Sequence, residues 1–164
     1  MSLKFEVCII EEQHLEPQIK DAAFNSFPSH WREIPGNDNK RAWTQQEPSY
    51  RVVATGPSGE FIGQIGLVAV CIKPVVLGVS DASVDVKYRE VGVATALLEA
   101  ACVFADETDS RLMIATSNKG LRRVCERLGF HAITDEVTLD GYDVIPESWM
   151  GRGDLGGVVV NDLF

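Results

Sequence analysis

Residues 84–101 carry a glycine and an arginine at a boundary between an extended segment and a helix, where proteins commonly hold anions. The stretch reads VDVKYREVGVATALLEAA, with Arg89, Gly92 and Ala94 at the turn. Glycine lets the backbone approach a ligand without a Cβ, and the first N–H groups of a helix point outward at the positive end of its dipole. A pyrophosphate would fit such a turn. Glycine also occurs at strand-to-helix turns for steric reasons alone, so the spacing by itself leaves a structural role open.

Other phosphate-binding and metal-binding patterns are missing from the sequence. It contains neither a GxxxxGK[ST] loop nor a GxGxxG turn. The histidines, His14, His30 and His131, have no partner at ligand spacing, so we expect no metal site. The four cysteines form no CxxC pair and lie in apolar stretches, which is typical of reduced core residues in a cytoplasmic protein. These cysteines are Cys8, Cys71, Cys102 and Cys125.

The elements that must position this turn alternate between strand and helix. Hydrophobic periodicity predicts strands over residues 3–10, 50–55, 61–72, 75–84, 112–116, 130–139 and 158–160, and helices within 11–27 and over 91–106 and 118–128. The GPSG between two of the strands predicts a hairpin, and a three-stranded antiparallel meander is the simplest arrangement of residues 50–84. The segment 28–48 has no clear period and is interpreted as helix fragments and loop.

Two motifs resemble those of the GCN5-related N-acetyltransferase family. The family signature V-x-P-x-Y-R-x-x-G-x-G/A, between its fourth strand and third helix, stands here as VDVKYREVGVA at residues 84–94. The second motif, an asparagine followed by a helix that ends in L-G-F, stands here as NKGLRRVCERLGF at residues 118–130. The positions of the two motifs along the sequence are also similar to those in the family. Residues 77–84 and the tail from Trp149 also resemble a branch that includes aminoglycoside 2′-acetyltransferases and rhizobial nodulation acyltransferases.

The resemblance implies a mixed α/β fold, the acyl-CoA N-acyltransferase fold, with a mainly antiparallel central sheet and helices on both faces. Its fourth and fifth strands would splay apart and expose backbone groups to the pantetheine arm of acetyl-coenzyme A, while amides from Glu90 to Thr95 would hold the pyrophosphate. Asn118 would contact the pantetheine, cap its helix, or do both. The residues implied to bind the cosubstrate are Ala82, Val84, Arg89, Glu90, Val91, Gly92, Val93, Ala94, Thr95 and Asn118.

The family chemistry is direct attack of an amine on the thioester, which needs an acid for the leaving thiolate and no metal. Many members carry a tyrosine seven residues after the asparagine, but this chain has Cys125 there. Cys125 is therefore a candidate general acid, with simple core packing as the alternative. Tyr88, Tyr142 or solvent are the substitutes for an acid at that position.

The position that holds the general base in many family members is also different in this chain. Many members have a glutamate near the start of the fourth strand, where this chain has only Gly78 and Ser80. Asp81 is the nearest carboxylate, with a solvated strand residue as its alternative role. Some relatives in the branch named above use their C-terminal carboxylate, which makes Phe164 a further candidate.

Composition bounds the domain count and the partners. A length of 164 residues predicts one domain over residues 1–164. Acidic residues outnumber basic ones 24 to 15, and the resulting charge of −9 repels nucleic acid and suits cationic acceptors. We see no apolar run of membrane-spanning length and no secretion signal, so we expect a cytoplasmic protein that does not bind membranes. An apolar tail strand could pair between subunits in a homodimer.

The expected function is transfer of an acetyl group from acetyl-coenzyme A to a primary amine of a small molecule. One alternative is an aminoglycoside-type drug acetyltransferase. Another is a noncatalytic acyl-CoA-binding regulatory module, because the family's usual tyrosine and glutamate are both missing. The residues that select the acceptor are expected in segments 25–48 and 140–164, as in the family.

Overall fold

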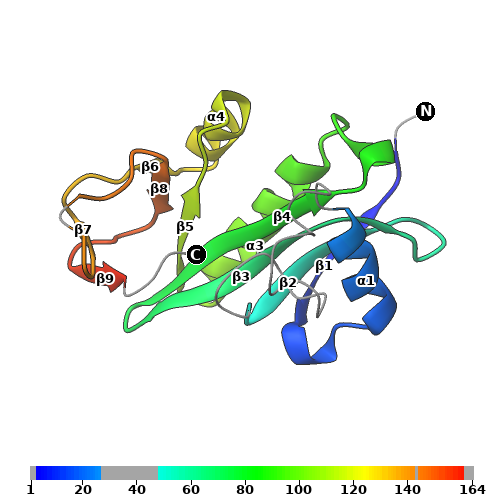
Figure 1. Ribbon diagram of the computed structural model, residues 1–164, viewed down its shortest axis with the longest axis horizontal. Coiled ribbons are helices and arrows are strands. Elements are labelled where there is room, and N and C mark those ends of the chain that lie inside the picture. The colour runs from blue at the N-terminus through cyan, green and yellow to red at the C-terminus, as the bar shows by residue number, and fades with distance from the viewer. Residues whose placement is uncertain (1–2, 27–47, 143, 161–164) are drawn as a thin grey trace.

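The computed structural model describes residues 3–26, 48–142 and 144–160, whose arrangement is shown in Figure 1. The described strands form a seven-stranded sheet in the order β1-β2-β3-β4-β5-β8-β6 and a separate pair, β7-β9. The strands of the large sheet are β1 (Glu6–Glu11), β2 (Tyr50–Thr55), β3 (Phe61–Ile72), β4 (Val75–Val84), β5 (Arg111–Ala115), β8 (Trp149–Arg152) and β6 (His131–Ala132). The parallel pair is β7 (Val137–Leu139) and β9 (Val158–Val160).

The pairing of β4 determines the shape of the sheet. Strands β1 to β4 form an antiparallel meander, as expected for β2 to β4, while β4 and β5 run parallel. Opposite Ile65 of β3, strand β4 has two residues, Asp81 and Ala82, which is a β-bulge. A bulge bends its strand, and β4 pairs with β5 only from Val76 to Val79. The splay between the fourth and fifth strands is therefore confirmed, and it leaves the β5-facing edge of residues 80–84 without a described strand partner.

Helices cover both faces of the sheet, as expected. The α-helices are α1 (Pro17–Asn25), α3 (Val93–Glu107) and α4 (Lys119–Arg127), with 3₁₀ turns η1 (Glu12–His14) and η2 (Val86–Tyr88). Two consecutive residues of β2 point to opposite faces and show the division. Val52 packs in the core cluster that contains residues of α3, and Val53 packs in the one that contains residues of α1. Figure 1 shows α1 in front of the meander and α3 behind it. No helix within the described ranges is long and apolar enough to cross a membrane.

The β7-β9 pair forms a second layer on the sheet face that carries α1, but over a different part of that face. Val137 and Val158 of this pair share a buried core with Val68 of β3 and Met113 of β5. Figure 1 shows the pair at the end of the molecule away from α1. The described part of the chain thus has apolar cores on both sides of one sheet.

Several boundaries differ from the sequence-based expectation. Helix α3 begins at Val93, since Gly92 belongs to the turn before it. The expected strand over 130–139 is two short strands, because the Glu136 carboxylate accepts hydrogen bonds from the Thr134 amide and hydroxyl at 3.0 and 2.9 Å and closes a turn. Strand β8 was not predicted. Cys8 is exposed on the edge strand β1 instead of lying in the core. Most of the unclear segment 28–48 falls outside the described residues.

Candidate active site

A cleft of about 710 Å³ opens where β4 leaves β5. Its lining comes from both faces of the sheet. Ser26, Gln64 and Ser83 line it on the α1 side, and Leu97 of α3 and Leu121 of α4 line it on the other. The cleft therefore passes around the open edge of β4 and connects the two faces.

The turn before α3 forms one end of this cleft. Gly92 has φ +86°, a left-handed conformation that favours glycine, and Glu90 also has a positive φ of 66°. A Cβ built on Gly92 would meet no atom within 4 Å, so the glycine faces open space. Helix α3 has no side-chain N-cap, and its first hydrogen bond runs from the Ala96 amide to the Gly92 carbonyl at 3.1 Å. The preceding amides have no partner within the helix, so they suit a phosphate.

Arg89 joins this turn to both neighbouring elements. Its Nε donates to the Val84 carbonyl at 3.1 Å, and its Nη2 donates to the Ser26 carbonyl, at the end of α1, at 3.4 Å. The Asp85 amide donates to Ile62 of β3 at 2.8 Å, so by strand alternation the backbone groups of Val84 face away from β3, toward the cleft. A carbonyl oxygen accepts two hydrogen bonds, so Val84 can also bind a ligand.

Asn118 is the N-cap of α4, and its side-chain oxygen accepts a hydrogen bond from the Leu121 amide at 2.9 Å. It also borders the cleft, so a contact with a ligand is compatible with the cap. Val91 differs from the other expected binding residues, because it is 51% exposed and does not line the cleft. The expected binding residues that do line it are Ala82, Val84, Arg89, Glu90, Gly92, Val93, Ala94, Thr95 and Asn118.

The candidate acids lie in different surroundings. The Cys125 side chain is fully buried in the core between α3 and α4, and this burial raises the pKa of its thiol to about 11. Helix α4 presents Leu121 and Val124 to the cleft instead. Tyr88 lines the cleft, whereas Tyr142 belongs to another pocket. The geometry therefore favours the packing role for Cys125.

The two candidate bases are Asp81 and the C-terminal carboxylate of Phe164. The backbone of Asp81 lies in the β4 bulge, next to the open edge that lines the cleft. Phe164, whose C-terminal carboxylate was the other candidate, falls outside the described residues. Among the residues that are described, no group of three or more His, Cys, Asp or Glu side chains could hold a metal.

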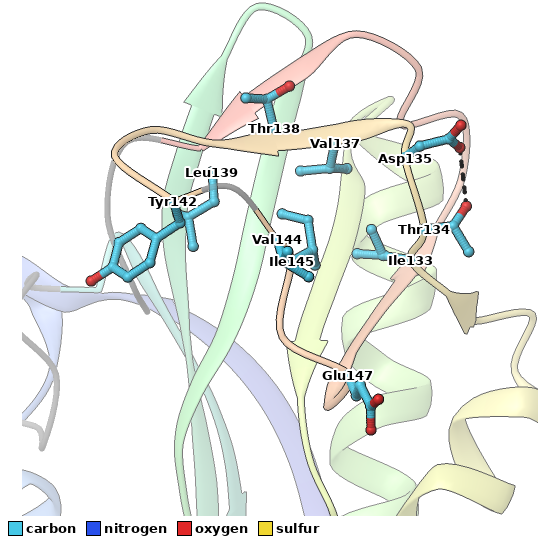
Figure 2. Close-up of a pocket in the computed structure, with 10 residues that line it drawn as sticks. All are labelled: Ile133, Thr134, Asp135, Val137, Thr138, Leu139, Tyr142, Val144, Ile145 and Glu147. Carbon is cyan, nitrogen blue, oxygen red and sulfur yellow. Dashed lines mark hydrogen bonds between the residues drawn. The ribbon is translucent and has the colours of Figure 1, made fainter.

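A second pocket, of about 410 Å³, lies between β7 and the segment that leads to β8. Figure 2 shows Ile133, Val137, Val144 and Ile145 around its centre, with Tyr142 pointing away from them. None of its lining residues lines the cleft at β4. The pocket is therefore separate from the candidate active site.

A buried row of polar side chains leads across the α1 face of the sheet to the cleft. Arg51 of β2 donates to Glu12 through Nε at 2.7 Å and Nη2 at 3.3 Å, and through Nη1 to Gln64 Oε1 at 2.7 Å. Gln64 Nε2 donates to Ser83 Oγ at 3.1 Å, and Lys20 approaches Glu12 at 3.5 Å. Each residue of the row Glu12–Arg51–Gln64–Ser83 is at most 7% exposed. The row joins the first turn of the chain to the wall of the cleft.

The sequence reasoning overlooked Gln64 and Ser83 as site residues. The signal for Gln64 is the presence of one polar side chain inside an otherwise apolar strand, FIGQIGLVAVCI, and Arg51 in YRVVAT is a similar case. Such positions are buried in this fold, and buried polar groups require partners.

Comparison with known proteins agrees with this geometry. Residues 16–149 match the family model described as an acetyltransferase (GNAT) domain. The chain belongs to the GNAT acetyltransferase family. No curated protein sequence gives a significant match.

Solved structures show the same fold at low sequence identity. The GNAT family N-acetyltransferase YhbS from Escherichia coli, in complex with CoA, has a TM-score of 0.67 and 17% identity, covering 98% of this chain and 89% of its own. A spermidine N-acetyltransferase chimera from Vibrio cholerae and hSSAT has a TM-score of 0.58 and 15% identity, covering 89% and 94%. An aminoglycoside 6′-N-acetyltransferase complexed with coenzyme A has a TM-score of 0.60 and 15% identity, covering 88% and 96%. The shared architecture is the acyl-CoA N-acyltransferase fold.

Proposed function

We propose that this protein transfers an acetyl group from acetyl-coenzyme A to a primary amine of a small molecule. The observation that carries the proposal is the meeting, in one cleft, of the left-handed turn at Gly92 with the open edge of β4. The turn supplies amides for a pyrophosphate, and the edge supplies extended backbone for an amide-containing chain. Acetyl-coenzyme A contains both groups in series.

The cosubstrate is held mainly by backbone groups. The amides of residues 92–95 bind the pyrophosphate, and the backbone of Ala82 and Val84 binds the pantetheine arm as an added strand would. Arg89 holds the turn against β4 through the Val84 carbonyl, so it acts more through position than through charge. The pantetheine arm then points along β4 toward the bulge.

At the bulge, the neutral amine nitrogen attacks the thioester carbon. The new C–N bond forms, the C–S bond breaks, the amine loses one proton and the thiolate gains one. Asp81 is the proposed base because its backbone lies at the bulge, and the C-terminal carboxylate of Phe164 is the alternative. The proton for the thiolate comes from Tyr88, which lines the cleft, or from solvent, since Cys125 is enclosed in the core.

The acceptor is proposed to be a cationic small molecule. The net charge of −9 attracts cations to the protein from a distance. Acetyltransferases for spermidine and for aminoglycosides, both polyamines, have the same fold, so an aminoglycoside-type drug acetyltransferase remains the alternative. A reducing cytoplasm suits the four free cysteines.

The experiment is a turnover assay combined with calorimetry. Acetyl-coenzyme A is mixed with a panel of amines that includes spermidine, an aminoglycoside and a monoamine, and release of free thiol is recorded. The proposal requires amine-dependent thiol release with saturable CoA binding. Saturable CoA binding without thiol release for any amine would instead support the noncatalytic binding module.

A further inference from the structure

The row Glu12–Arg51–Gln64–Ser83 runs beneath α1 and ends in the cleft, on the face of the sheet opposite to α3. Replacing a buried ion pair by apolar residues is often neutral or stabilising, so fold stability does not by itself require charges here. Neither Glu12 nor Arg51 lines the cleft, whereas Gln64 and Ser83 do. Glu12 and Arg51 can therefore affect a ligand in the cleft only through Gln64 and Ser83.

The hydrogen bonds of the row fix the direction of the Gln64 carboxamide. Arg51 has donors only, so the atom of Gln64 that faces it must be the oxygen. The nitrogen then faces Ser83, whose hydroxyl oxygen accepts from it. Ser83 Oγ in turn donates a long hydrogen bond to the Ala23 carbonyl at 3.5 Å, so one lone pair of its oxygen remains for a ligand. Ser83 thus carries an oriented acceptor oxygen at the cleft wall.

We propose that Ser83 and Gln64 form the acceptor side of the cleft and that the Glu12–Arg51 pair positions them for a hydrogen-bonding amine. This inference rests on the proposed function and adds the site where the amine is recognised. The CoA-binding turn lies at the start of α3, which packs on the other face of the sheet, so the two substrates meet around the open edge of β4. Ser83 and Gln64 contact the substrate, while Arg51 and Glu12 are positioning residues.

The first test compares two equally buried serines of β4. Ser83→Ala removes the proposed acceptor oxygen, and Ser80→Ala is the control, because Ser80 is 8% exposed against 7% for Ser83 but does not line the cleft. With spermidine as the probe, Ser83→Ala is expected to raise the amine KM about tenfold and to leave the Kd for CoA unchanged. An unchanged amine KM, or an equal rise in Ser80→Ala, overturns the inference.

The second test asks whether Arg51 acts through Gln64. The double variant Glu12→Gln/Arg51→Met removes both charges, so no unpaired charge stays in the core. It is expected to raise the amine KM in the wild-type background but to add nothing in a Gln64→Met background, where the carboxamide is gone. Additive effects in this cycle overturn the positioning role. If the double variant does not fold, Ser83→Ala still decides the recognition role.

The third test measures binding of the amine near Gln64 directly. The side-chain NH₂ signals of Gln64 are followed by NMR while spermidine, an aminoglycoside and a monoamine are each added to the CoA-saturated protein. At least one amine is expected to shift these signals after CoA alone has ceased to move them. Turnover without such a shift overturns the inference and leaves the proposed function intact. Neither turnover nor a shift means that both have failed.

Discussion

At the scale of single residues, the cleft depends on positions where a backbone conformation or a small volume is required. Gly92 combines a left-handed φ of +86° with open space in the direction of a Cβ. Gly59, in the turn between β2 and β3, has φ +78° and equally open space, but it does not line the cleft. The two glycines therefore separate the cost of backbone strain from the effect on ligand binding.

We expect Gly92→Asp to weaken CoA binding more than a hundredfold, because it places a carboxylate where a pyrophosphate must approach amides. Gly92→Ala, which adds only a Cβ and strain of about 1 kcal/mol, should weaken it less. Gly59→Ala and Gly59→Asp should lower the free energy of unfolding by a similar amount without changing the Kd for CoA. Calorimetry and thermal melts check these values. Equal CoA affinities in the Gly92 and Gly59 variants would contradict a phosphate site at the turn.

Cys125 gives the second prediction at this scale. Because its side chain packs in the core, Cys125→Ala should cost about 1–2 kcal/mol of unfolding free energy through lost volume, while kcat at low temperature stays near the parent value. The buried thiol has a pKa of about 11 against 9.0 for the free group, so its contribution to stability is complete below pH 9 and declines as pH rises toward 11.

Denaturant titrations between pH 7 and pH 11 test the second part, because the Cys125→Ala variant should lose less stability over this range than the parent. Steady-state kinetics test the first part. A drop in kcat of a hundredfold or more in a well-folded Cys125→Ala protein would restore the thiol as the general acid.

At the scale of elements, β3 and α3 are in close contact beneath the turn. A Cβ on Gly63 would lie 3.1 Å from both the Ser83 carbonyl oxygen and Val93 Cγ1, and 3.2 Å from Val84 Cγ2. These atoms belong to the open stretch of β4 and to the first residue of α3. The absence of a side chain at Gly63 therefore sets the distance between the turn and the strand edge.

We expect Gly63→Ala to lower the free energy of unfolding by about 1–3 kcal/mol and to weaken CoA binding, because Val93 and the β4 backbone must move apart. Denaturant unfolding and calorimetry on the same sample provide both values. Lost stability with an unchanged Kd would mean that the spacing of the two elements does not matter for the cosubstrate.

The turn between β6 and β7 gives a pH-dependent prediction. Burial raises the pKa of the Glu136 carboxyl, but hydrogen bonds from its own amide, from Thr134 and from His131 outweigh this and lower the pKa to about 2. A carboxyl whose pKa is below its ordinary 4.5 stabilises the fold above that value and loses this contribution as pH falls toward 2. Glu136→Gln should therefore be less stable than the parent at pH 7, with the difference shrinking between pH 4.5 and pH 2. Denaturant midpoints measured across this range test it, and a pH-independent difference would contradict it.

The elements that the sequence predicted well are those with a strong local pattern. Helix α3 and the strands of the meander are periodic and bounded by turn residues, and the motif around Gly92 identifies the end of the cleft. Strand β8 was missed because its four residues, WMGR, carry no period and pair with β5, more than 30 positions earlier. The polar row was missed because Arg51 and Gln64 acquire buried partners only through the register of β2 and β3.

At the scale of the whole molecule, the net charge of −9 acts on the two proposed substrates in opposite directions. Spermidine is cationic and acetyl-coenzyme A is anionic, so long-range attraction favours the first and repulsion disfavours the second. Salt screens both effects over a Debye length of about 10 Å at 0.1 M. This field changes the rate at which each substrate meets the protein and leaves the contacts inside the cleft largely unchanged.

Raising the ionic strength from about 0.02 M to about 0.3 M should therefore lower kcat/KM for spermidine and raise kcat/KM for acetyl-coenzyme A. A monoamine acceptor should show a shallower fall than spermidine, because it carries less charge. Initial rates at limiting concentrations of each substrate check this. Equal slopes for the monoamine and spermidine would contradict steering by the protein's net charge.

The bulge in β4 also has a consequence for inhibitors. Because β4 separates from β5 after Val79, one edge of β4 has no described strand partner in the interior of the sheet. The gap beside this edge holds a cleft of small-molecule size. An extended peptide backbone with small side chains offers amide donors and acceptors to a strand edge, as the pantetheine arm does. A short Gly/Ala-rich peptide that ends in a phosphorylated residue would match both the strand edge and the turn, and so would compete with the cosubstrate without containing a nucleotide.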